Sequence, residues 1–168
     1  LLCVPATLLT VAAEAAHGSE LKVGGETCHP NESGAHTGDI SAEMLADAGA
    51  SHVIVGHSER RTDHGETNEI VAAQAAAALR AGPTPIICIG ESLDQRKAGE
   101  TLDFVASQID GSIPEGAKAE EIVIAYEPIW AIDTGEVATP DQIDEVHTAI
   151  RTRLAQRFGA DGADQIPL

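Results

Sequence analysis

Short apolar runs recur along the chain, and segments with helical patterning separate them. Thr67–Ala81 has an alanine-rich body and is followed by Gly82, a residue type that commonly ends helices. Thr139, Pro140 and Gln142 combine an N-cap, a first-turn proline and a capping-box glutamine. Strands that alternate with helices pair in parallel through right-handed crossovers, so this pattern predicts an α/β fold. The expected strands are Leu1–Val4, Leu21–Gly24, Ser51–Gly56, Pro85–Gly90 and Glu121–Tyr126, with the start of a sixth at Gln165–Leu168.

Two further helical segments follow from the same pattern, at Ser41–Gly49 and Thr101–Asp110. The helix that begins after Thr139 carries one apolar stripe before Gly159, which predicts that this face is buried. The stripe consists of Ile143, Val146, Ile150 and Leu154.

The alternation alone does not distinguish an open doubly wound sheet from part of a (β/α)8 barrel. A complete barrel typically needs about 250 residues. The length of 168 residues therefore favours the open sheet. However, the chain begins without methionine inside a predicted strand and stops where another would start, which predicts an interior piece of a longer protein. Because no linker or low-complexity tract divides residues 1–168, we expect a single, incomplete domain.

The composition limits which binding partners and which cellular compartment are expected. The 27 acidic and 10 basic residues give a formal charge of −17, which repels phosphate backbones and anionic lipid and argues against nucleic-acid and membrane partners. Cys3, Cys28 and Cys88 form no Cys-x-x-Cys pair, so we interpret them as reduced, structural thiols of a cytosolic protein. The apolar amino-terminal segment lacks the methionine and basic region of a signal peptide. No segment reaches the ~20 apolar residues that span a membrane.

The first candidate for chemistry is His57, because parallel α/β folds place their functional residues at the carboxyl ends of strands. It opens a polar cluster directly after the predicted strand Ser51–Gly56. One interpretation is a solvated helix start, with Ser58 as N-cap and Glu59 near the positive end of the helix dipole. The other gives His57 a function, because an imidazole beside a helix N-terminus can stay neutral and donate a hydrogen bond to a carbonyl oxygen.

The second candidate is Glu127, which follows the predicted strand Glu121–Tyr126. A lone glutamate there is more often an ion-pair partner or a hydrogen-bond acceptor than a catalytic base. Its neighbours Pro128 and Trp130 would partly desolvate the carboxylate and raise its pKa toward the range of a general base. Pro128–Thr139 also has the composition of a lid, with fixed ends, a bulky anchor and small residues. Such a lid would exclude water from proton transfer at carbon.

Four motifs carry a resemblance to a known family. The segments "VIVGHSERR", "PIICIGESLDQR", "AYEPIWAIDTG" and "SGAHTGDISAEMLADAGASHVIVGHSERR" resemble triosephosphate isomerases, in particular bacterial ones, and the resemblance covers essentially all 168 residues. It implies a (β/α)8 TIM barrel, of which this chain spans roughly the second strand to the start of the seventh. It also implies a cytoplasmic homodimer that interconverts dihydroxyacetone phosphate and glyceraldehyde 3-phosphate, a step of glycolysis and gluconeogenesis, with no cofactor and no metal.

The resemblance also assigns roles to particular residues. Glu127 would be the base that moves the proton between two substrate carbons, through an enediolate. His57 would polarise the carbonyl and stabilise that enediolate. Pro128–Gly135 would be the lid over the phosphate, with the backbone of Asp133 at its tip binding the substrate. The segment Thr27–Asp39 resembles the dimer loop of the family, in which Thr37 would reach the neighbouring subunit's pocket, although its composition also fits an ordinary turn.

The chain departs from the family pattern at several points. Asp133 stands where the lid tip has glycine, and Glu26 stands where an amide is expected. The first-strand lysine that neutralises substrate charge and the glycine-rich phosphate turns after the seventh and eighth strands have no counterpart in the chain. We therefore expect the isolated chain to be inactive.

Two alternatives from other function classes stay open. A non-catalytic acidic α/β module of receiver type would carry clustered aspartates at the end of an early strand, and neither "LLCVPAT" nor "LKVGGETC" contains them. A different barrel enzyme acting on sugar phosphates could share a phosphate-binding turn, but not the "YEPIWAI" segment. An assay with dihydroxyacetone phosphate separates these alternatives from the isomerase.

Overall fold

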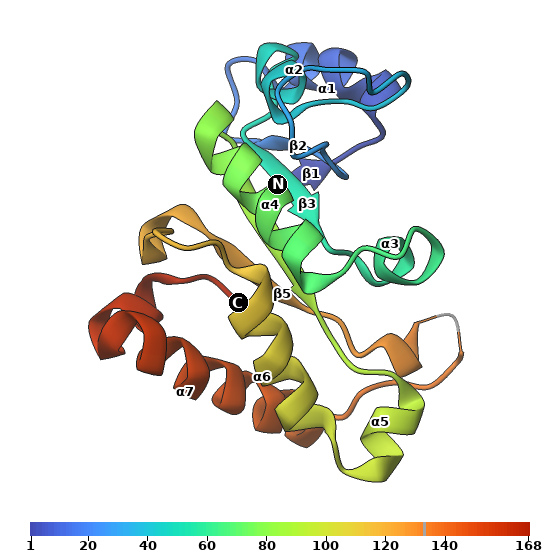
Figure 1. The fold of residues 1–168 in the computed structure, drawn as a ribbon, viewed down its shortest axis with the longest axis vertical. Coiled ribbons are helices and arrows are strands. Elements are labelled where there is room, and N and C mark those ends of the chain that lie inside the picture. Colours follow the sequence, from blue (N-terminus) through green and yellow to red (C-terminus); the bar gives the residue numbers. More distant parts are fainter. Residues whose placement is uncertain (133) are drawn as a thin grey trace.

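One parallel sheet organises the chain in the computed structural model, which describes residues 1–132 and 134–168 (Figure 1). The sheet has five strands, β1 (Leu2–Cys3), β2 (Val23–Gly25), β3 (His52–Val55), β4 (Thr84–Ile89) and β5 (Val123–Tyr126). Their spatial order is β1-β2-β3-β4-β5, so each strand pairs with the next one along the chain. A barrel wall is built in this way, whereas a doubly wound sheet reverses its order at a switch point. The fold is therefore a partial (β/α)8 barrel, and the prediction of an open sheet from the chain length is wrong.

The helices confirm most of the predicted segments. Thr67 caps α4 with its hydroxyl, and Gly82 ends that helix in the left-handed conformation with φ 108°. Thr139 and Gln142 form the predicted capping box at the start of α7. The short helices α1 and α5 were not expected from the sequence pattern. The helices are α1 (Leu9–Ala16), α2 (Ala42–Asp47), α3 (Ser58–Asp63), α4 (Asn68–Ala81), α5 (Leu93–Ala98), α6 (Thr101–Ser112) and α7 (Pro140–Gln165), with short 3-10 turns at Ala6–Leu8, Ala119–Glu121 and Ile129–Ala131.

The carboxyl-terminal part of the chain corrects one prediction. Gly159 breaks α7 with a φ of 76°, as expected, but the chain resumes a helical course and stays helical to Gln165. No strand forms at Gln165–Leu168. A single backbone bond joins this end to β5, from the Ile124 N–H to the Pro167 carbonyl at 3.1 Å. Since proline has no N–H, Pro167 cannot return a ladder bond, and the pairing stops there.

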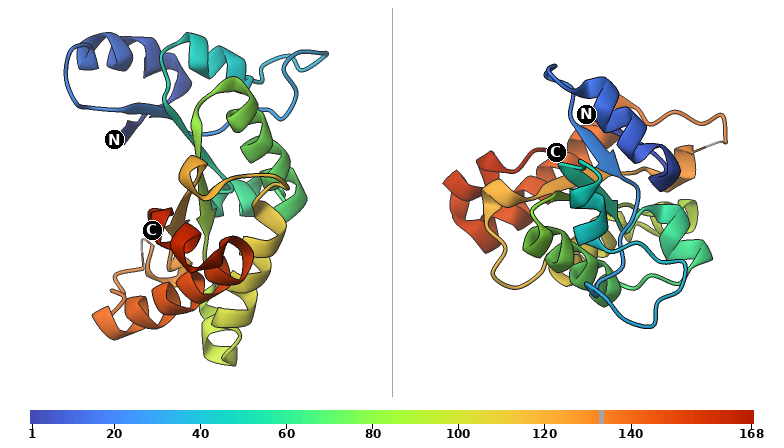
Figure 2. Two further views of the ribbon diagram at one scale, coloured as in Figure 1. Left: turned by 90° about the vertical axis from the view of Figure 1, so that its left-hand side faces the viewer. Right: turned by 90° about the horizontal axis from the view of Figure 1, so that it is seen from above.

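The core lies between the sheet and the helices that cover one of its faces (Figures 1 and 2). Side chains of a strand alternate between faces, and the fully buried set in β3 to β5 points toward α4, α6 and α7. This set comprises Val53, Val55, Ile87, Ile89 and Ile124. Three members of the predicted stripe on α7, Val146, Ile150 and Leu154, are buried, but Ile143 in the first turn is 38% exposed.

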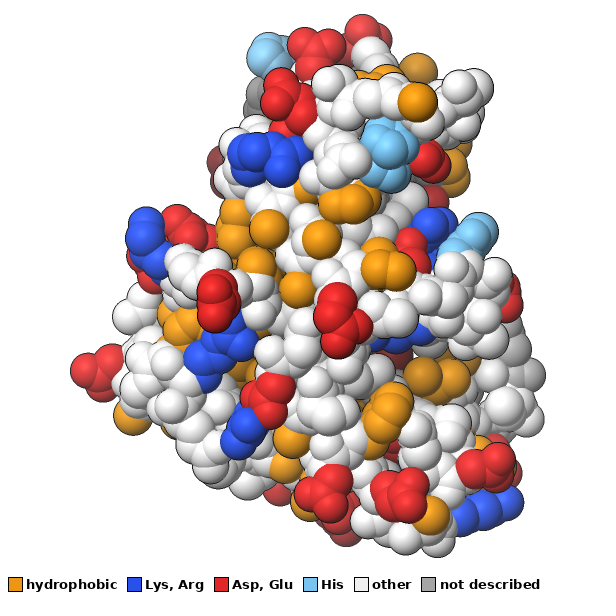
Figure 3. All heavy atoms as spheres, viewed as in Figure 1, with side chains coloured by type: hydrophobic (Ala, Val, Ile, Leu, Met, Phe, Trp, Pro, Cys, Tyr) orange, Lys and Arg blue, Asp and Glu red, His pale blue; other side chains and the backbone are white. Residues whose placement is uncertain are grey.

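The remaining surface is acidic, with apolar side chains between the charged ones (Figure 3). Cys3, Cys28 and Cys88 carry free thiols, as predicted. Within residues 1–132 and 134–168, no helix combines the length and apolar character needed to cross a membrane.

In the described part of the sheet, β1 pairs only with β2 and β5 only with β4, so each outer strand has a partner on one side.

Candidate active site

A sharp turn places His57 at the carboxyl end of β3. Gly56 turns the chain with a φ of 68°, and a Cβ atom there would come within 2.8 Å of Val71, so glycine is required on both grounds. His57 is the N-cap of α3, and its Nδ1 atom accepts the backbone N–H of Glu59 at 3.3 Å. The expected N-cap, Ser58, is instead the first helical residue and is buried. The interpretation of this segment as a helix start is thus correct, with the cap one residue earlier.

Glu127 lies at the same edge of the sheet, at the end of β5. Its backbone N–H donates to the Ile89 carbonyl at 2.8 Å, which extends the pairing with β4. Gly90 permits this approach, because a Cβ atom at position 90 would lie 1.8 Å from the Glu127 carbonyl oxygen. The Glu127 side chain points back across β4 toward α3, where its Oε2 accepts the Ser58 N–H at 3.2 Å.

The two predicted catalytic side chains touch. His57 Nε2 lies 2.7 Å from Glu127 Oε1, and the Glu127 side chain is only 15% exposed. The tautomer of His57 follows from its two contacts. Since Nδ1 accepts the Glu59 N–H, the ring proton of the neutral imidazole is on Nε2, which donates to the carboxylate. The site therefore combines a carboxylate with a neutral N–H donor.

The environment adjusts the acidity of Glu127. Burial raises the pKa of its carboxyl above the ordinary value, against the opposing effects of His57, the Ser58 N–H and Arg61. Burial, followed by the charge of Glu127, also raises the pKa of the neighbouring Cys88 thiol, which therefore remains protonated. A desolvated carboxylate with a raised pKa is a stronger base than an exposed one.

Arg61 ties the end of β3 to the surrounding elements, and no role was predicted for it. Its guanidinium donates to the Gly56 and Cys88 carbonyls at 2.7 and 3.1 Å. It also donates to Asn68 Oδ1 at 2.8 Å and Ser112 Oγ at 3.0 Å. These bonds join β3, β4, α4 and α6 beneath the turn that carries His57, so Arg61 positions the turn.

Glu91 anchors the segment that follows Glu127. It is fully buried, separated from the end of β4 by Gly90 alone, and its carboxylate accepts the Trp130 indole N–H at 2.8 Å and the Tyr126 hydroxyl at 3.0 Å. Arg96 lies 3.3 Å from the same carboxylate. Burial and then the charge of Glu91 raise the pKa of the Tyr126 phenol, so it stays a donor. The bulky anchor predicted in the lid is thus held by a buried acid.

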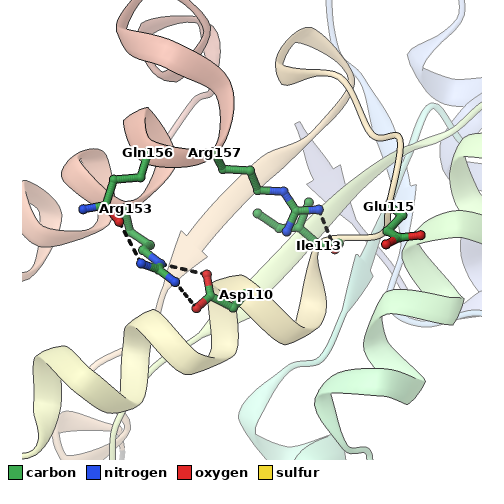
Figure 4. A pocket seen from close by; sticks show the side chains of 6 residues that line it. All are labelled: Asp110, Ile113, Glu115, Arg153, Gln156 and Arg157. Atoms are coloured by element: carbon green, nitrogen blue, oxygen red, sulfur yellow. Dashed lines mark hydrogen bonds and ion pairs between the residues drawn. The ribbon is translucent and has the colours of Figure 1, made fainter.

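Two hollows of the surface differ in their relation to these residues. One of about 330 Å³ adjoins His57 and is lined by Glu26, Thr27, Ile54, Glu59 and Arg60 as well. A larger one of about 480 Å³ lies between α6 and α7, away from the strand ends (Figure 4). There Arg153 pairs with Asp110, and Arg157 donates to the Ile113 and Pro114 carbonyls at 2.9 Å. Because parallel α/β barrels bind their substrates at the carboxyl ends of the strands, the hollow beside His57 is the better candidate for substrate.

The other predicted site residues lie apart from the pair or outside the description. Thr37 is exposed in the turn that joins His36 to Asp39, and it does not line the hollow beside His57. Asp133 lies outside the described residues. Sequence reasoning missed Glu91, although the signal was the same as for Glu127, an acid that directly follows an apolar strand.

Comparisons with known proteins agree with this arrangement. The family described as "Triosephosphate isomerase" matches residues 1–168. The triosephosphate isomerase of Hyphomonas neptunium is 68% identical over 162 residues, covering 96% of this chain and 65% of that protein. The one of Ruegeria pomeroyi is 58% identical over 168 residues, covering 100% of this chain and 67% of that protein.

A solved structure extends the likeness to three dimensions. The crystal structure of triosephosphate isomerase from Bartonella henselae superposes with a TM-score of 0.91 at 49% identity, covering 98% of this chain and 67% of that chain. The chain thus spans about two thirds of the length of these relatives. The strand order, the residues at the strand ends and these matches lead to one conclusion, that the chain belongs to the triosephosphate isomerase family.

Proposed function

We propose that the protein is an aldose–ketose isomerase that interconverts dihydroxyacetone phosphate and glyceraldehyde 3-phosphate. The observation that carries the proposal is the 2.7 Å contact between His57 Nε2 and Glu127 Oε1 at the strand ends. The reaction needs a base next to a neutral hydrogen-bond donor. Neither the removal of the proton from carbon nor its return needs a metal or a cofactor. Family membership supports the same substrate and a cytoplasmic homodimer.

In the proposed mechanism, the substrate binds between the two side chains, so that His57 exchanges its bond to Glu127 for one to the substrate carbonyl. Glu127 removes a proton from the carbon next to that carbonyl. The electron pair of the broken C–H bond forms a carbon–carbon double bond, and the carbonyl oxygen becomes the enediolate oxygen. His57 Nε2–H stabilises this oxygen because the donor is already oriented by the Glu59 N–H. The proton of the adjacent substrate hydroxyl then passes to the former carbonyl oxygen, and Glu127 returns its proton to the carbon that bears this oxygen, so that the double-bond electrons form the new carbonyl at the other carbon.

The segment Pro128–Gly135 is the proposed lid, and closing it would exclude water from the enediolate. Its described residues support this proposal. Trp130 is buried against Glu91, and Thr134 Oγ1 donates to the Trp130 carbonyl at 2.9 Å. The tip of the lid, with the backbone of Asp133, is the proposed contact to the phosphate, and Thr37 is the proposed contact to a second subunit.

The experiment that tests the proposal uses a completed barrel, meaning this chain joined to the amino- and carboxy-terminal segments of a full-length relative. We expect this protein to turn over dihydroxyacetone phosphate, with product measured through a coupled dehydrogenase. A folded completed barrel without turnover would contradict the proposal. It would then favour a non-catalytic module.

His57→Gln in the completed barrel should lower kcat by about 100- to 1000-fold, because the glutamine amide is a weaker and less firmly oriented donor to the developing oxyanion than the imidazole N–H. It should also move the acid limb of kcat/KM to higher pH. When the imidazole of His57 is protonated, its charge lowers the pKa of Glu127. Glutamine carries no charge, so the pKa of Glu127 rises in the variant, and the base must be ionised to act. A pH profile of the two proteins checks both effects.

The matched control is His17→Gln, which changes an exposed histidine at the end of α1 and should leave the profile unchanged. An acid limb that stays in place while kcat falls would separate the two roles of His57. It would show that His57 does not influence the ionisation of Glu127.

Glu91→Ala should destabilise the completed barrel by about 3 kcal/mol, the order expected when one member of a buried charge pair is removed. The indole of Trp130, the hydroxyl of Tyr126 and the guanidinium of Arg96 would all lose an acceptor. Urea unfolding measures the effect, with Glu145→Ala as control, because Glu145 pairs with Arg96 at an exposed position. Equal losses in the two variants would show that the buried anchor contributes no more than a surface pair.

A further inference from the structure

Arg61 carries a positive charge beneath the candidate active site, and no carboxylate among the described residues forms an ion pair with it. Its four hydrogen-bond acceptors are all neutral. They are the carbonyl oxygens of Gly56 and Cys88, Asn68 Oδ1 and Ser112 Oγ, at 2.7, 3.1, 2.8 and 3.0 Å. We infer that the charge of Arg61 holds Glu127 in its ionised form. Arg61 thus acts through Glu127 rather than on the substrate, as a positioning residue for the base.

The guanidinium keeps its charge in this setting. Burial lowers the pKa of Arg61, and the neighbouring acidic groups Cys88, Glu66 and Glu127 oppose that effect. Because the ordinary pKa of arginine lies above about 12, the side chain stays protonated throughout the neutral range. A charge that is partly withdrawn from water acts on its neighbours through a lower dielectric constant than an exposed one. Arg61 can therefore influence a carboxylate that it does not touch.

Two carboxylates act on Arg61, and only one of them lacks an arginine of its own. Glu66 Oε1 lies 2.7 Å from Arg60 Nε, so its charge is already paired. Glu127 instead contacts the neutral imidazole of His57. Glu127 is therefore the carboxylate that depends on the charge of Arg61.

The helix α3 and the strand β4 both connect the guanidinium to Glu127. Ser58 lies on the same short helix as Arg61, and its N–H donates to Glu127 Oε2 at 3.2 Å. On β4, the Cys88 carbonyl accepts from Arg61, while the Cys88 thiol lowers the pKa of Glu127 through a hydrogen bond. The groups that face the Glu127 carboxylate from these two elements are His57, Ser58, Arg61 and Cys88.

The charge of Arg61 opposes the effect of burial on the base. Burial raises the pKa of the Glu127 carboxyl, and Arg61 is among the groups that lower it. These opposing effects allow a desolvated carboxylate to be a strong base and still be ionised. The acid limb of kcat/KM reports the ionisation of the base in the free enzyme, so its position should depend on Arg61.

The test neutralises the charge without removing the hydrogen bonds. Arg61→Gln would lose the charge and the four bonds together, so it cannot separate an electrostatic role from a structural one. Asn68→Asp in the completed barrel places a carboxylate at the atom that accepts from Arg61 at 2.8 Å. An aspartate in the first turn of α4 also suits the helix dipole, so this variant should fold. We expect its acid limb to move to higher pH, which lowers kcat/KM on the acid side by about tenfold for each unit by which the limb moves.

Two control variants distinguish the charge from the bonds. Asn68→Ala removes one bond to Arg61 but leaves its charge, so the acid limb should stay in place. Both substitutions of Asn68 also lose its bond to the Ser107 carbonyl, so they are matched in that respect. Thr67→Asp adds the same negative charge at the exposed N-cap of α4, where the side chain faces the Ile70 N–H, and its acid limb should also stay in place. A purely structural role of Arg61 predicts the reverse, because Asn68→Asp keeps the bond that Asn68→Ala loses.

The effect on turnover rests on the proposed function, so the second measurement does not use turnover. Nuclear magnetic resonance of carboxyl-labelled glutamate in the completed barrel, with the Glu127 signal assigned through Glu127→Gln, gives the pKa of Glu127 directly. We expect this pKa to rise in Asn68→Asp and to stay in place in Asn68→Ala and Thr67→Asp. An unchanged pKa in Asn68→Asp, or an equal rise in either control, overturns the inference. If the pKa rises only in Asn68→Asp and the completed barrel shows no turnover, the inference holds and the proposed function fails.

Discussion

Glu127→Asp in the completed barrel should lower kcat by at least about 100-fold, because shortening the side chain moves the base by about 1 Å. The structure makes this distance critical. The backbone of Glu127 is fixed to β4 through the Ile89 carbonyl, and Gly90 leaves no space for adjustment on that side. A shorter side chain cannot recover the lost reach by moving its backbone. Steady-state rates in both directions measure the effect.

Two variants complete that experiment. Glu127→Gln keeps the length of the side chain and can accept from Ser58, but it cannot remove a proton, so its kcat should fall further than that of Glu127→Asp. Glu120→Asp shortens an exposed glutamate outside the site and should behave like the parent. Exchange of substrate hydrogen with solvent should fall in parallel with turnover. A Glu127→Asp protein with the parent rate would exclude Glu127 as the base.

The strand ends could be found from the sequence because they combine two independent signals. Strand–helix alternation identifies each apolar run, and parallel pairing brings the carboxyl ends of these runs to one edge. That argument places His57 and Glu127 at the same edge, and the structure brings their side chains into contact. Their partners could not be found in this way. Ser58 and Glu127 are 69 residues apart, and only the sheet, which brings the ends of β3 and β5 to one edge, makes them neighbours.

Glu91 shows more clearly what the sequence pattern cannot predict. It directly follows the predicted strand Pro85–Gly90, as Glu127 follows the predicted strand Glu121–Tyr126, and the pattern treats the two acids alike. The two acids differ in the hydrogen-bond donors that surround them. Tyr126 and Trp130, which lie 35 and 39 residues later, saturate Glu91, whereas Glu127 faces His57. The choice between an anchoring acid and a base thus depends on long-range contacts. The failed sixth strand at Gln165–Leu168 has the same origin, since a strand needs neighbours that its own residues do not specify.

The 168-residue chain by itself should show no isomerase turnover above background, although it contains both His57 and Glu127. In the described sheet, β1 and β5 each pair on one side only. In a closed barrel, every strand pairs on both sides. Large apolar side chains near β1 are also uncovered, with Leu1, Leu2 and Leu21 between 47% and 57% exposed. An open wall cannot enclose the substrate or exclude water from an enediolate.

Binding of a hydrophobic dye and thermal unfolding separate this explanation from a simple defect of the catalytic pair. The 168-residue chain should bind the dye more strongly and unfold at a lower temperature than the completed barrel, because its edges and apolar face are open. Glu127→Gln in the completed barrel is the matched control, since it should lose turnover while its dye binding and unfolding stay like those of the parent barrel. If the 168-residue chain turned over substrate at the rate of the completed barrel, closure would not be required, and the strand ends of the half-barrel alone would suffice for catalysis.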